Sequence, residues 1–220
     1  VLWAKSEFIN VYIKLKPSNE ITPLVLAFNQ FLTQQQLTQK YQIKSFLQSH
    51  PLHLTLYLTH YQPEAIPKVL RRVKHIAQQT PPVCFTTGSF VVDKRAYVML
   101  AVKNNQALQQ LSNTVVNTLQ GLRDKQAIIP AWAAHDQARV RLFKHYGSPG
   151  VFTLFAPHFS ILWPSHLSVE QQKMLAQRLK TGIHQFISQQ NSQRIAYAAA
   201  LAVGIADQQG QIVKELAAFP

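Results

Sequence analysis

The chain has 220 residues, 47% of them hydrophobic, which is typical of a globular protein with one sizeable core and argues against intrinsic disorder. Twenty-two Lys and Arg residues against nine Asp and Glu residues give a formal net charge of +13. This excess favours a polyanionic partner such as RNA, DNA or a nucleotide, with a generally basic surface as the alternative. Cys84 is the only cysteine, which excludes an internal disulfide and a thiolate metal cluster, and its apolar neighbours argue against a catalytic thiol.

No window of the sequence approaches the roughly 20 apolar residues that a membrane-spanning helix needs, so we expect a soluble protein with no membrane partner. The sequence begins with Val1 rather than Met, which is consistent with removal of an initiator segment or signal peptide. Leu2-Trp3-Ala4 is then a candidate processing remnant. We expect a cytoplasmic location, with an exported or periplasmic one as the alternative if such a signal preceded Val1.

The first predicted elements are a strand and a helix. Apolar and polar residues alternate from Ile9 to Leu15, which indicates a half-buried strand, and Pro17 ends it. Thr22 is a good N-cap residue and Pro23 suits the first helical position, so we expect a helix to begin there.

The next predicted strand is residues 51–59, Pro-Leu-His-Leu-Thr-Leu-Tyr-Leu-Thr, in which leucines alternate with polar residues. Because successive side chains of a strand point to opposite faces, the leucines should lie under helices. His53 and Thr55 should then stand side by side on the wetter face. Tyr57 shares that face and, with Tyr12 of the first strand, offers a ring on which a base can stack.

The middle of the chain predicts a helix, a hairpin and two further helices. Residues 63–79 carry an apolar stripe, and four cations lie largely off it; we expect them to be solvated, with contact to nucleic acid as the alternative. These cations are Lys68, Arg71, Arg72 and Lys74. The hairpin spans residues 84–103 and turns at Asp93-Lys94-Arg95. The helices follow at 108–122 and 131–145, the second closed by Gly147.

A second segment, Pro-His-Phe-Ser-Ile-Leu-Trp at 157–163, repeats the arrangement of the first motif strand. His158 and Ser160 share one face, and Trp163 falls with Phe159 and Ile161 on the other, which favours core packing for the tryptophan. Ser168 to Gln171 then resembles a capping box at the start of a helix. A last hairpin is predicted at 195–219, turning at Asp207-Gln-Gln-Gly210.

The two halves therefore match in the order of motif strand, amphipathic helix and hairpin. This order predicts an α+β fold with two pseudo-symmetric lobes, each an antiparallel sheet with helices on its outer face. The lobes are approximately residues 9–103 and 104–220 of a single domain over residues 1–220, and exchange of strands between them is allowed. The faces that carry the histidines should meet across a central cleft.

Two histidines, each with a hydroxyl two residues away, suit the cleavage of a phosphodiester. One imidazole takes a proton from the attacking oxygen and the other gives a proton to the leaving oxygen, near neutral pH and without a metal. A hydroxyl beside each ring stabilises the charge on the phosphoryl oxygens.

His53-Leu-Thr-Leu56 and His158-Phe-Ser-Ile161 resemble the paired motifs of the two-histidine (2H) phosphoesterases, which include 2′,3′-cyclic nucleotide phosphodiesterases and 2′-5′ RNA ligase-like proteins. The resemblance implies that the two histidines are the catalytic acid and base, in an order that the sequence leaves open. It also implies that Thr55 and Ser160 contact the phosphate and that no cofactor or metal is required.

The other histidines are weaker candidates. His60 and His166 each follow a motif strand and are expected in exposed loops at the rim of the cleft. A zinc site made of His53, His158 and one of them is the alternative, although no recognisable zinc-ligand spacing accompanies them. The segment 131–150 is longer than the family pattern requires, and either caps the cleft or packs on a lobe.

The sequence thus predicts a monomeric, metal-independent phosphoesterase that acts on a nucleotide or an RNA end, opening a 2′,3′-cyclic phosphate or cleaving a 2′-5′ or 3′-5′ linkage. The first alternative is a non-catalytic module that binds a nucleotide or RNA in the same cleft. The second is an enzyme on phosphoesters that are not nucleic acids.

Overall fold

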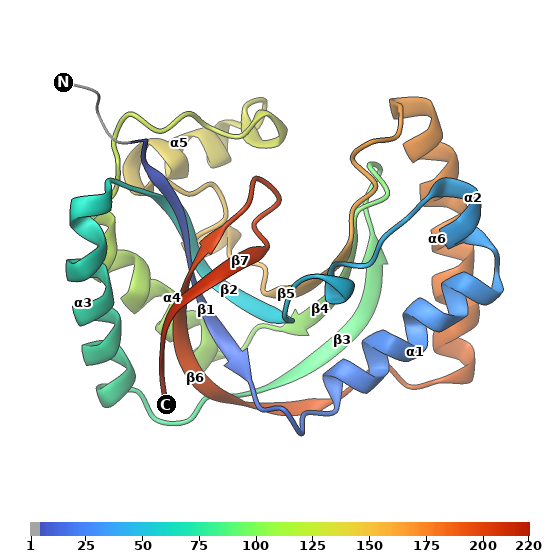
Figure 1. Ribbon diagram of the computed structural model, residues 1–220, viewed down its shortest axis with the longest axis horizontal. Helices are drawn as coiled ribbons and strands as arrows, with labels where there is room; N and C mark the ends of the chain where they lie inside the picture. Colours follow the sequence, from blue (N-terminus) through green and yellow to red (C-terminus); the bar gives the residue numbers. More distant parts are fainter. Residues whose placement is uncertain (1–4) are drawn as a thin grey trace.

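The structure is a computed structural model that describes residues 5–220, so the candidate remnant Leu2-Trp3-Ala4 lies outside the described residues. It is an α+β fold in which a seven-stranded antiparallel sheet is flanked by helices (Figure 1). The strands are β1 (Glu7–Leu15), β2 (His53–Tyr61), β3 (Cys84–Val92), β4 (Val98–Lys103), β5 (His158–Leu162), β6 (Ile195–Ala206) and β7 (Ile212–Phe219). The α-helices are α1 (Ile21–Gln34), α2 (Leu37–Tyr41), α3 (Ile66–Gln79), α4 (Gln106–Leu119), α5 (Gln137–Tyr146) and α6 (Val169–Gln189).

The sheet has the strand order β2-β1-β6-β3-β4-β5, and β7 pairs with β6. The central strand β6 is long and serves both halves: Ile195 to Tyr197 pair with β3, and Ala198 to Ile205 pair with β1. The two strands at the ends of the order, β2 and β5, contact each other. The sheet therefore curves so that the two histidine-bearing strands meet.

Strands are exchanged between the two halves of the sequence. The hairpin β3–β4 pairs with β5 of the second half, and the hairpin β6–β7 pairs with β1 of the first half. The sheet therefore mixes strands from the ranges 9–103 and 104–220.

Two pairs of helices cover the outer sides of the curved sheet (Figure 1). Helices α3 and α4 pack on β6 and β2, and helices α1 and α6 lie on the opposite side, where α6 packs on β3. One large apolar cluster joins these helices to the sheet and includes Leu54, Phe159 and Phe186, each at most 4% exposed. No helix within residues 5–220 combines the length and apolarity needed to cross a membrane.

Two predicted helix ends are confirmed, but the helix predicted at 131–145 begins only at Gln137, after a short 3-10 turn at Ala131–Ala133, and one predicted N-cap is wrong. Gly147 closes α5 with a φ of 71°, a left-handed conformation that glycine adopts without strain, and Ser168 and Gln171 form the capping box of α6. At α1 the predicted N-cap Thr22 is wrong. The side chain of Asn19 instead accepts hydrogen bonds from the first amides of the helix, which begins at Ile21.

Candidate functional site

The two motif histidines lie at the first positions of β2 and β5, the strands that meet where the sheet curves on itself. His53 is 5% exposed and His158 is partly buried. Burial is the main cause that lowers the pKa of His53, and the positive charge of a protonated His158 lowers it further. The strands that carry the two imidazoles contact each other, so a proton on one ring opposes a proton on the other.

A β-bulge occurs at the same place in both motifs. In β2, Tyr57 and Thr55 pair with the adjacent residues Val11 and Tyr12, so Leu56 is the extra residue. In β5, Leu162 and Ser160 pair with the adjacent residues Val98 and Met99, so Ile161 is the extra residue. A bulge reverses the alternation of side chains beyond it. Residues after the fourth motif position consequently lie on the face opposite to the one that simple alternation predicts.

Asn10 of β1 orients the hydroxyl of the first motif. Its Nδ2 donates a hydrogen bond to Thr55 Oγ1 at 2.8 Å and another to the carbonyl of Gly210 at 3.2 Å. Asn10 is completely buried, so its amide is held in place. Because this amide occupies an acceptor site of Thr55 Oγ1, the proton of the hydroxyl is free to point elsewhere.

His53 is held between two backbone carbonyls. Its Nδ1 lies 3.1 Å from the oxygen of Pro51 and its Nε2 lies 3.2 Å from the oxygen of Gly210. A carbonyl only accepts, so both contacts are hydrogen bonds only when the ring is protonated on both nitrogens. Burial opposes this by lowering the pKa of His53, the two carbonyls raise it, and the net shift is downward.

Gly210 belongs to the turn between β6 and β7, which has the predicted residues. The carboxylate of Asp207 accepts hydrogen bonds from the amides of Gln209 and Gln211, and Gly210 has a φ of 79° that favours glycine. Gln209 also donates a hydrogen bond to Ser165 in the loop after β5. The turn therefore connects the surroundings of the two motifs.

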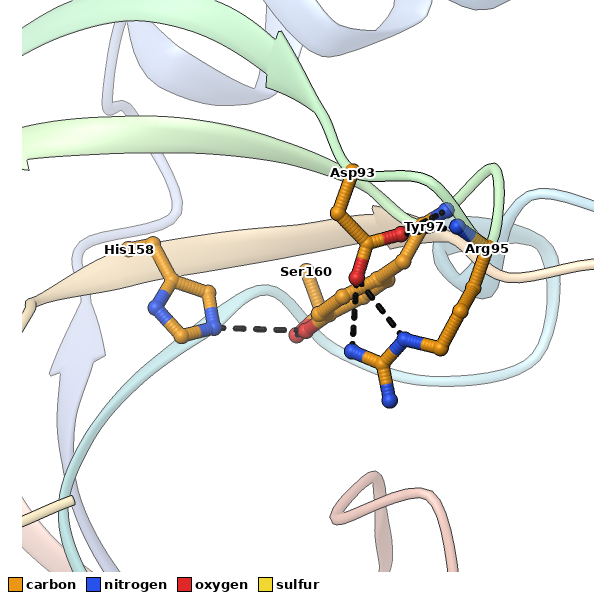
Figure 2. A network of polar contacts seen from close by, with 5 residues as sticks. All are labelled: Asp93, Arg95, Tyr97, His158 and Ser160. Atoms are coloured by element: carbon orange, nitrogen blue, oxygen red, sulfur yellow. Dashed lines mark hydrogen bonds and ion pairs between the residues drawn. The ribbon is translucent and has the colours of Figure 1, made fainter. Parts of the chain in front are cut away.

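In the second motif, Tyr97 of the β3–β4 hairpin contacts the side chains of both His158 and Ser160 (Figure 2). Its hydroxyl lies 3.2 Å from His158 Nε2 and also shares a short hydrogen bond with Ser160 Oγ. His158 Nδ1 lies 2.8 Å from the carbonyl of Ala156 and must carry a proton to form that bond. In the neutral ring Nε2 is therefore an acceptor. Burial lowers the pKa of His158, which favours this neutral form.

A guanidinium group stands beside this contact (Figure 2). Asp93 accepts two hydrogen bonds from the side chain of Arg95, at 2.8 and 2.6 Å, and its other oxygen accepts from the amides of Arg95 and Tyr97 to shape the turn. The guanidinium carbon of Arg95 lies 5.4 Å from the centre of the Trp163 ring, and Tyr97 lies 5.9 Å from the same ring. These residues form one cluster with His158 and Ser160.

Trp163 is therefore not a core residue, and the expectation from alternation is corrected. The bulge at Ile161 places it on the face of His158 and Ser160. Its Nε1 is buried and has no hydrogen-bond partner among the described residues. An unused donor of this kind is costly unless something accepts from it, and a ligand can do so.

The two tyrosines proposed for base stacking are both buried. Tyr57 is 1% exposed and its hydroxyl donates to the carbonyl of Tyr146, because the bulge at Leu56 directs it to the core face; it offers no ring to a ligand. Tyr12 is also 1% exposed but packs edge-on against His53, with ring centres 5.5 Å apart. Its hydroxyl donates to Glu215, so Tyr12 positions the imidazole rather than presenting an open face.

The remaining candidates lie outside this centre. His60 stacks on Phe8, with ring centres 4.4 Å apart, and His166 Nε2 lies 3.1 Å from the carbonyl of Tyr41. Within residues 5–220, no group of three or more His, Cys, Asp or Glu side chains is placed to hold a metal ion. The long segment before β5 packs on a lobe, since Thr59 of β2 donates to the carbonyl of Gly147.

Sequence reasoning missed Asn10, Tyr97 and Arg95 as members of the site. Asn10 was recognisable as the polar residue that shares a face with Tyr12 in the first strand. Arg95 lies in the predicted turn, and Tyr97 follows it. Nothing local to the hairpin indicates that it pairs with β5 rather than with the strands of its own half.

Comparison with known proteins gives a family and a fold. A family model described as the 2′-5′ RNA ligase superfamily matches residues 26–161. Among solved structures, LigT of Escherichia coli in apo form matches with a TM-score of 0.51 and 12% sequence identity, over 98% of this chain and 99% of that one. A structure described as a phosphoesterase matches with a TM-score of 0.50 and 12% identity, over 98% of each chain. Usb1 of Kluyveromyces marxianus has 13% identity and a TM-score of 0.48, over 91% of this chain and 93% of that one. The comparison with curated proteins finds no match.

Proposed function

The chain belongs to the 2′-5′ RNA ligase superfamily of two-histidine phosphoesterases, and from this membership we propose that it hydrolyses a phosphodiester at a nucleotide or RNA end. We propose a 2′,3′-cyclic phosphate as the first substrate to test, and a 2′-5′ or 3′-5′ linkage as the second. His53 and His158 are the catalytic residues of this proposal, and Thr55 and Ser160 are its phosphate contacts.

The observation that carries the proposal is that two histidines whose Nε2 atoms have different hydrogen-bond partners lie where β2 and β5 meet. In the neutral His158, the proton on Nδ1 leaves Nε2 as an acceptor, so this ring suits the general base. His53 faces the carbonyl of Gly210 through Nε2, which favours a proton on that nitrogen, so this ring suits the general acid.

In the proposed reaction, His158 Nε2 removes a proton from water as the water oxygen forms a bond to phosphorus. His53 gives the proton on its Nε2 to the leaving oxygen as the bond from that oxygen to phosphorus breaks. A 2′,3′-cyclic phosphate then becomes a phosphomonoester beside a free hydroxyl. Thr55 and Ser160 donate to the non-bridging oxygens, where charge accumulates in the transition state.

Binding of the phosphate requires two protein contacts to be replaced. The carbonyl of Gly210 occupies His53 Nε2, and the hydroxyl of Tyr97 occupies His158 Nε2 and Ser160 Oγ. An anionic phosphate next to the two rings raises the pKa of both, which compensates for the effect of burial on His53.

The same two contacts favour the alternative of a non-catalytic binding module, because they occupy the nitrogens that catalysis needs. One experiment separates the two functions. The protein is incubated with 2′,3′-cyclic nucleotides, 2′-5′ and 3′-5′ dinucleotides and short RNAs in the presence of a metal chelator. Turnover that persists with chelator supports the proposal. Binding without turnover of any of these compounds supports the binding module, and turnover that chelator abolishes contradicts metal independence.

A further inference from the structure

Helix α3 presents a basic surface that the proposed active site does not use. Between Ile66 and Gln79 it carries four Lys or Arg residues and one His, and no Asp or Glu. Lys68, Arg71, Lys74 and His75 are exposed, and Arg72 is partly buried. None of the ion pairs found within residues 5–220 involves a cation of this helix.

Four of these five basic side chains gather around one depression. Lys68, Arg71, Arg72 and His75 recur at helical spacing and line a hollow of about 270 Å³, together with Thr118 of α4. Arg72 is fixed there, because its guanidinium donates a hydrogen bond to the carbonyl of Thr118. Over seven residues the helix rises roughly 10 Å, so the stripe presents a row of positive charge rather than one point.

The chemistry of the surface favours a phosphate backbone over a membrane. A helix that lies on a bilayer exposes large apolar side chains next to its cations. In α3 the apolar residues Val69, Val73 and Ile76 are buried, and none of the exposed large hydrophobic side chains of residues 5–220 belongs to this helix. A row of Lys and Arg on a helix that exposes no large hydrophobic side chain is typical of contacts to successive phosphates.

We propose that the basic face of α3, formed by Lys68, Arg71, Arg72, Lys74 and His75, binds the phosphate backbone of single-stranded RNA. The choice of RNA over an acidic protein rests on the proposed function, since the substrate would then carry the phosphates that this face binds. Strand β2 rises roughly 26 Å from His53 to Tyr61, at about 3.3 Å per residue, before the chain turns into α3. Helix α3 covers the outer side of the curved sheet, whereas the two histidines lie where β2 and β5 meet, so we expect the surface to retain RNA away from the scissile bond and out of reach of a mononucleotide substrate.

A matched pair of variants tests this inference. Lys68→Gln/Arg71→Gln removes one Lys and one Arg from the hollow, and leaves Arg72 and its bond to Thr118 in place. Lys173→Gln/Arg178→Gln removes the same two residue types from α6, where both are exposed, on the opposite side of the molecule (Figure 1). The two variants have equal formal charge, so any difference in RNA binding between them depends on where on the molecule the charges were removed.

Binding of a short, fluorescently labelled single-stranded RNA is measured by anisotropy over a series of salt concentrations, with turnover of a 2′,3′-cyclic mononucleotide measured in parallel. We expect the α3 variant to bind RNA about tenfold more weakly at low salt and to lower the slope of log K against log salt by about 1.4, at about 0.7 per phosphate contact. The α6 variant should bind within about twofold of the unchanged protein, and both should keep their mononucleotide turnover.

Equal losses in both variants would mean a diffuse charge effect, and no loss in either would mean no site; both results overturn the inference. The inference is also overturned if the α3 variant binds RNA as well as the unchanged protein but binds anionic phospholipid vesicles or an acidic polypeptide more weakly. Because RNA binding is read without catalysis, failure of the proposed hydrolysis leaves this test intact. Failure of the α3 surface likewise leaves mononucleotide turnover unaffected.

Discussion

Asn10 should act on catalysis through Thr55, and a double-mutant cycle tests this directly. The amide of Asn10 donates to Thr55 Oγ1 at 2.8 Å, which leaves the hydroxyl proton for the phosphate. Asn10→Ala removes a neutral hydrogen bond of about 1 kcal/mol, so kcat/KM should fall about fivefold. Thr55→Val removes a donor to a charged oxygen, which contributes about 1.5–3 kcal/mol, so kcat/KM should fall about 10- to 150-fold.

The informative variant is the double one. Once the hydroxyl is gone there is nothing for Asn10 to orient, so adding Asn10→Ala to Thr55→Val should change kcat/KM by less than about twofold. The coupling free energy between the two positions should then be about 1 kcal/mol. Thr55→Ser keeps the hydroxyl and is the matched control, with an activity close to that of the unchanged protein.

The assay is steady-state hydrolysis of a 2′,3′-cyclic nucleotide, with urea unfolding of each variant alongside because Asn10 is completely buried. Effects on kcat/KM that add to within about 0.5 kcal/mol would refute the reasoning, since independent residues behave in that way. The same holds if Asn10→Ala lowers kcat/KM only in proportion to the fraction of protein that is unfolded.

Three further predictions concern the two motifs. His53→Ala and His158→Ala should each lower turnover of the cyclic nucleotide by at least about 10² while the circular dichroism spectrum stays unchanged, and full activity in both variants would disprove the assigned roles. Burial lowers the pKa of both histidines below 6.5. A general base must be neutral and a general acid protonated, so kcat/KM should peak between these two values, on the acidic side of pH 6.5; a maximum on the alkaline side would contradict this. Trp163→Phe keeps an aromatic ring but removes the unused Nε1 donor. It should raise the KM for a nucleotide substrate about five- to tenfold with little change in kcat, and an unchanged KM would mean that Trp163 does not contact the ligand.

The elements of this fold were largely predictable because their signals are local. Period-two alternation marked the strands at residues 9–15 and 51–59, the capping box marked the start of α6, and the left-handed glycine marked the end of α5. The pairing of the strands was not predictable. Which hairpin joins which motif strand depends on contacts between residues far apart in the sequence, and no local pattern of β3 or β4 indicates β5 as the partner.

The sequence predicted correctly which side chains share a face of each motif strand only for the residues before the bulges. His53 and Thr55 precede the bulge in β2, and His158 and Ser160 precede the bulge in β5. Leu56 and Ile161 look like ordinary apolar residues in an alternating pattern, so the extra residue at each position is invisible in the sequence. One missed feature therefore accounts for two misplaced side chains, because it directed Tyr57 into the core and Trp163 onto the face of the site.

The central claim is that His53 and His158 act on the same phosphate, and a titration followed by NMR tests it most directly. A nucleoside 3′-monophosphate is added to protein with ¹⁵N-labelled histidine, and the ring nitrogens of both residues are observed. We predict that both rings shift together with a single Kd, that the pKa of each rises on binding, and that His158→Ala weakens the binding reported by His53. A shift of one ring alone, or two rings that report different Kd values, would contradict the account.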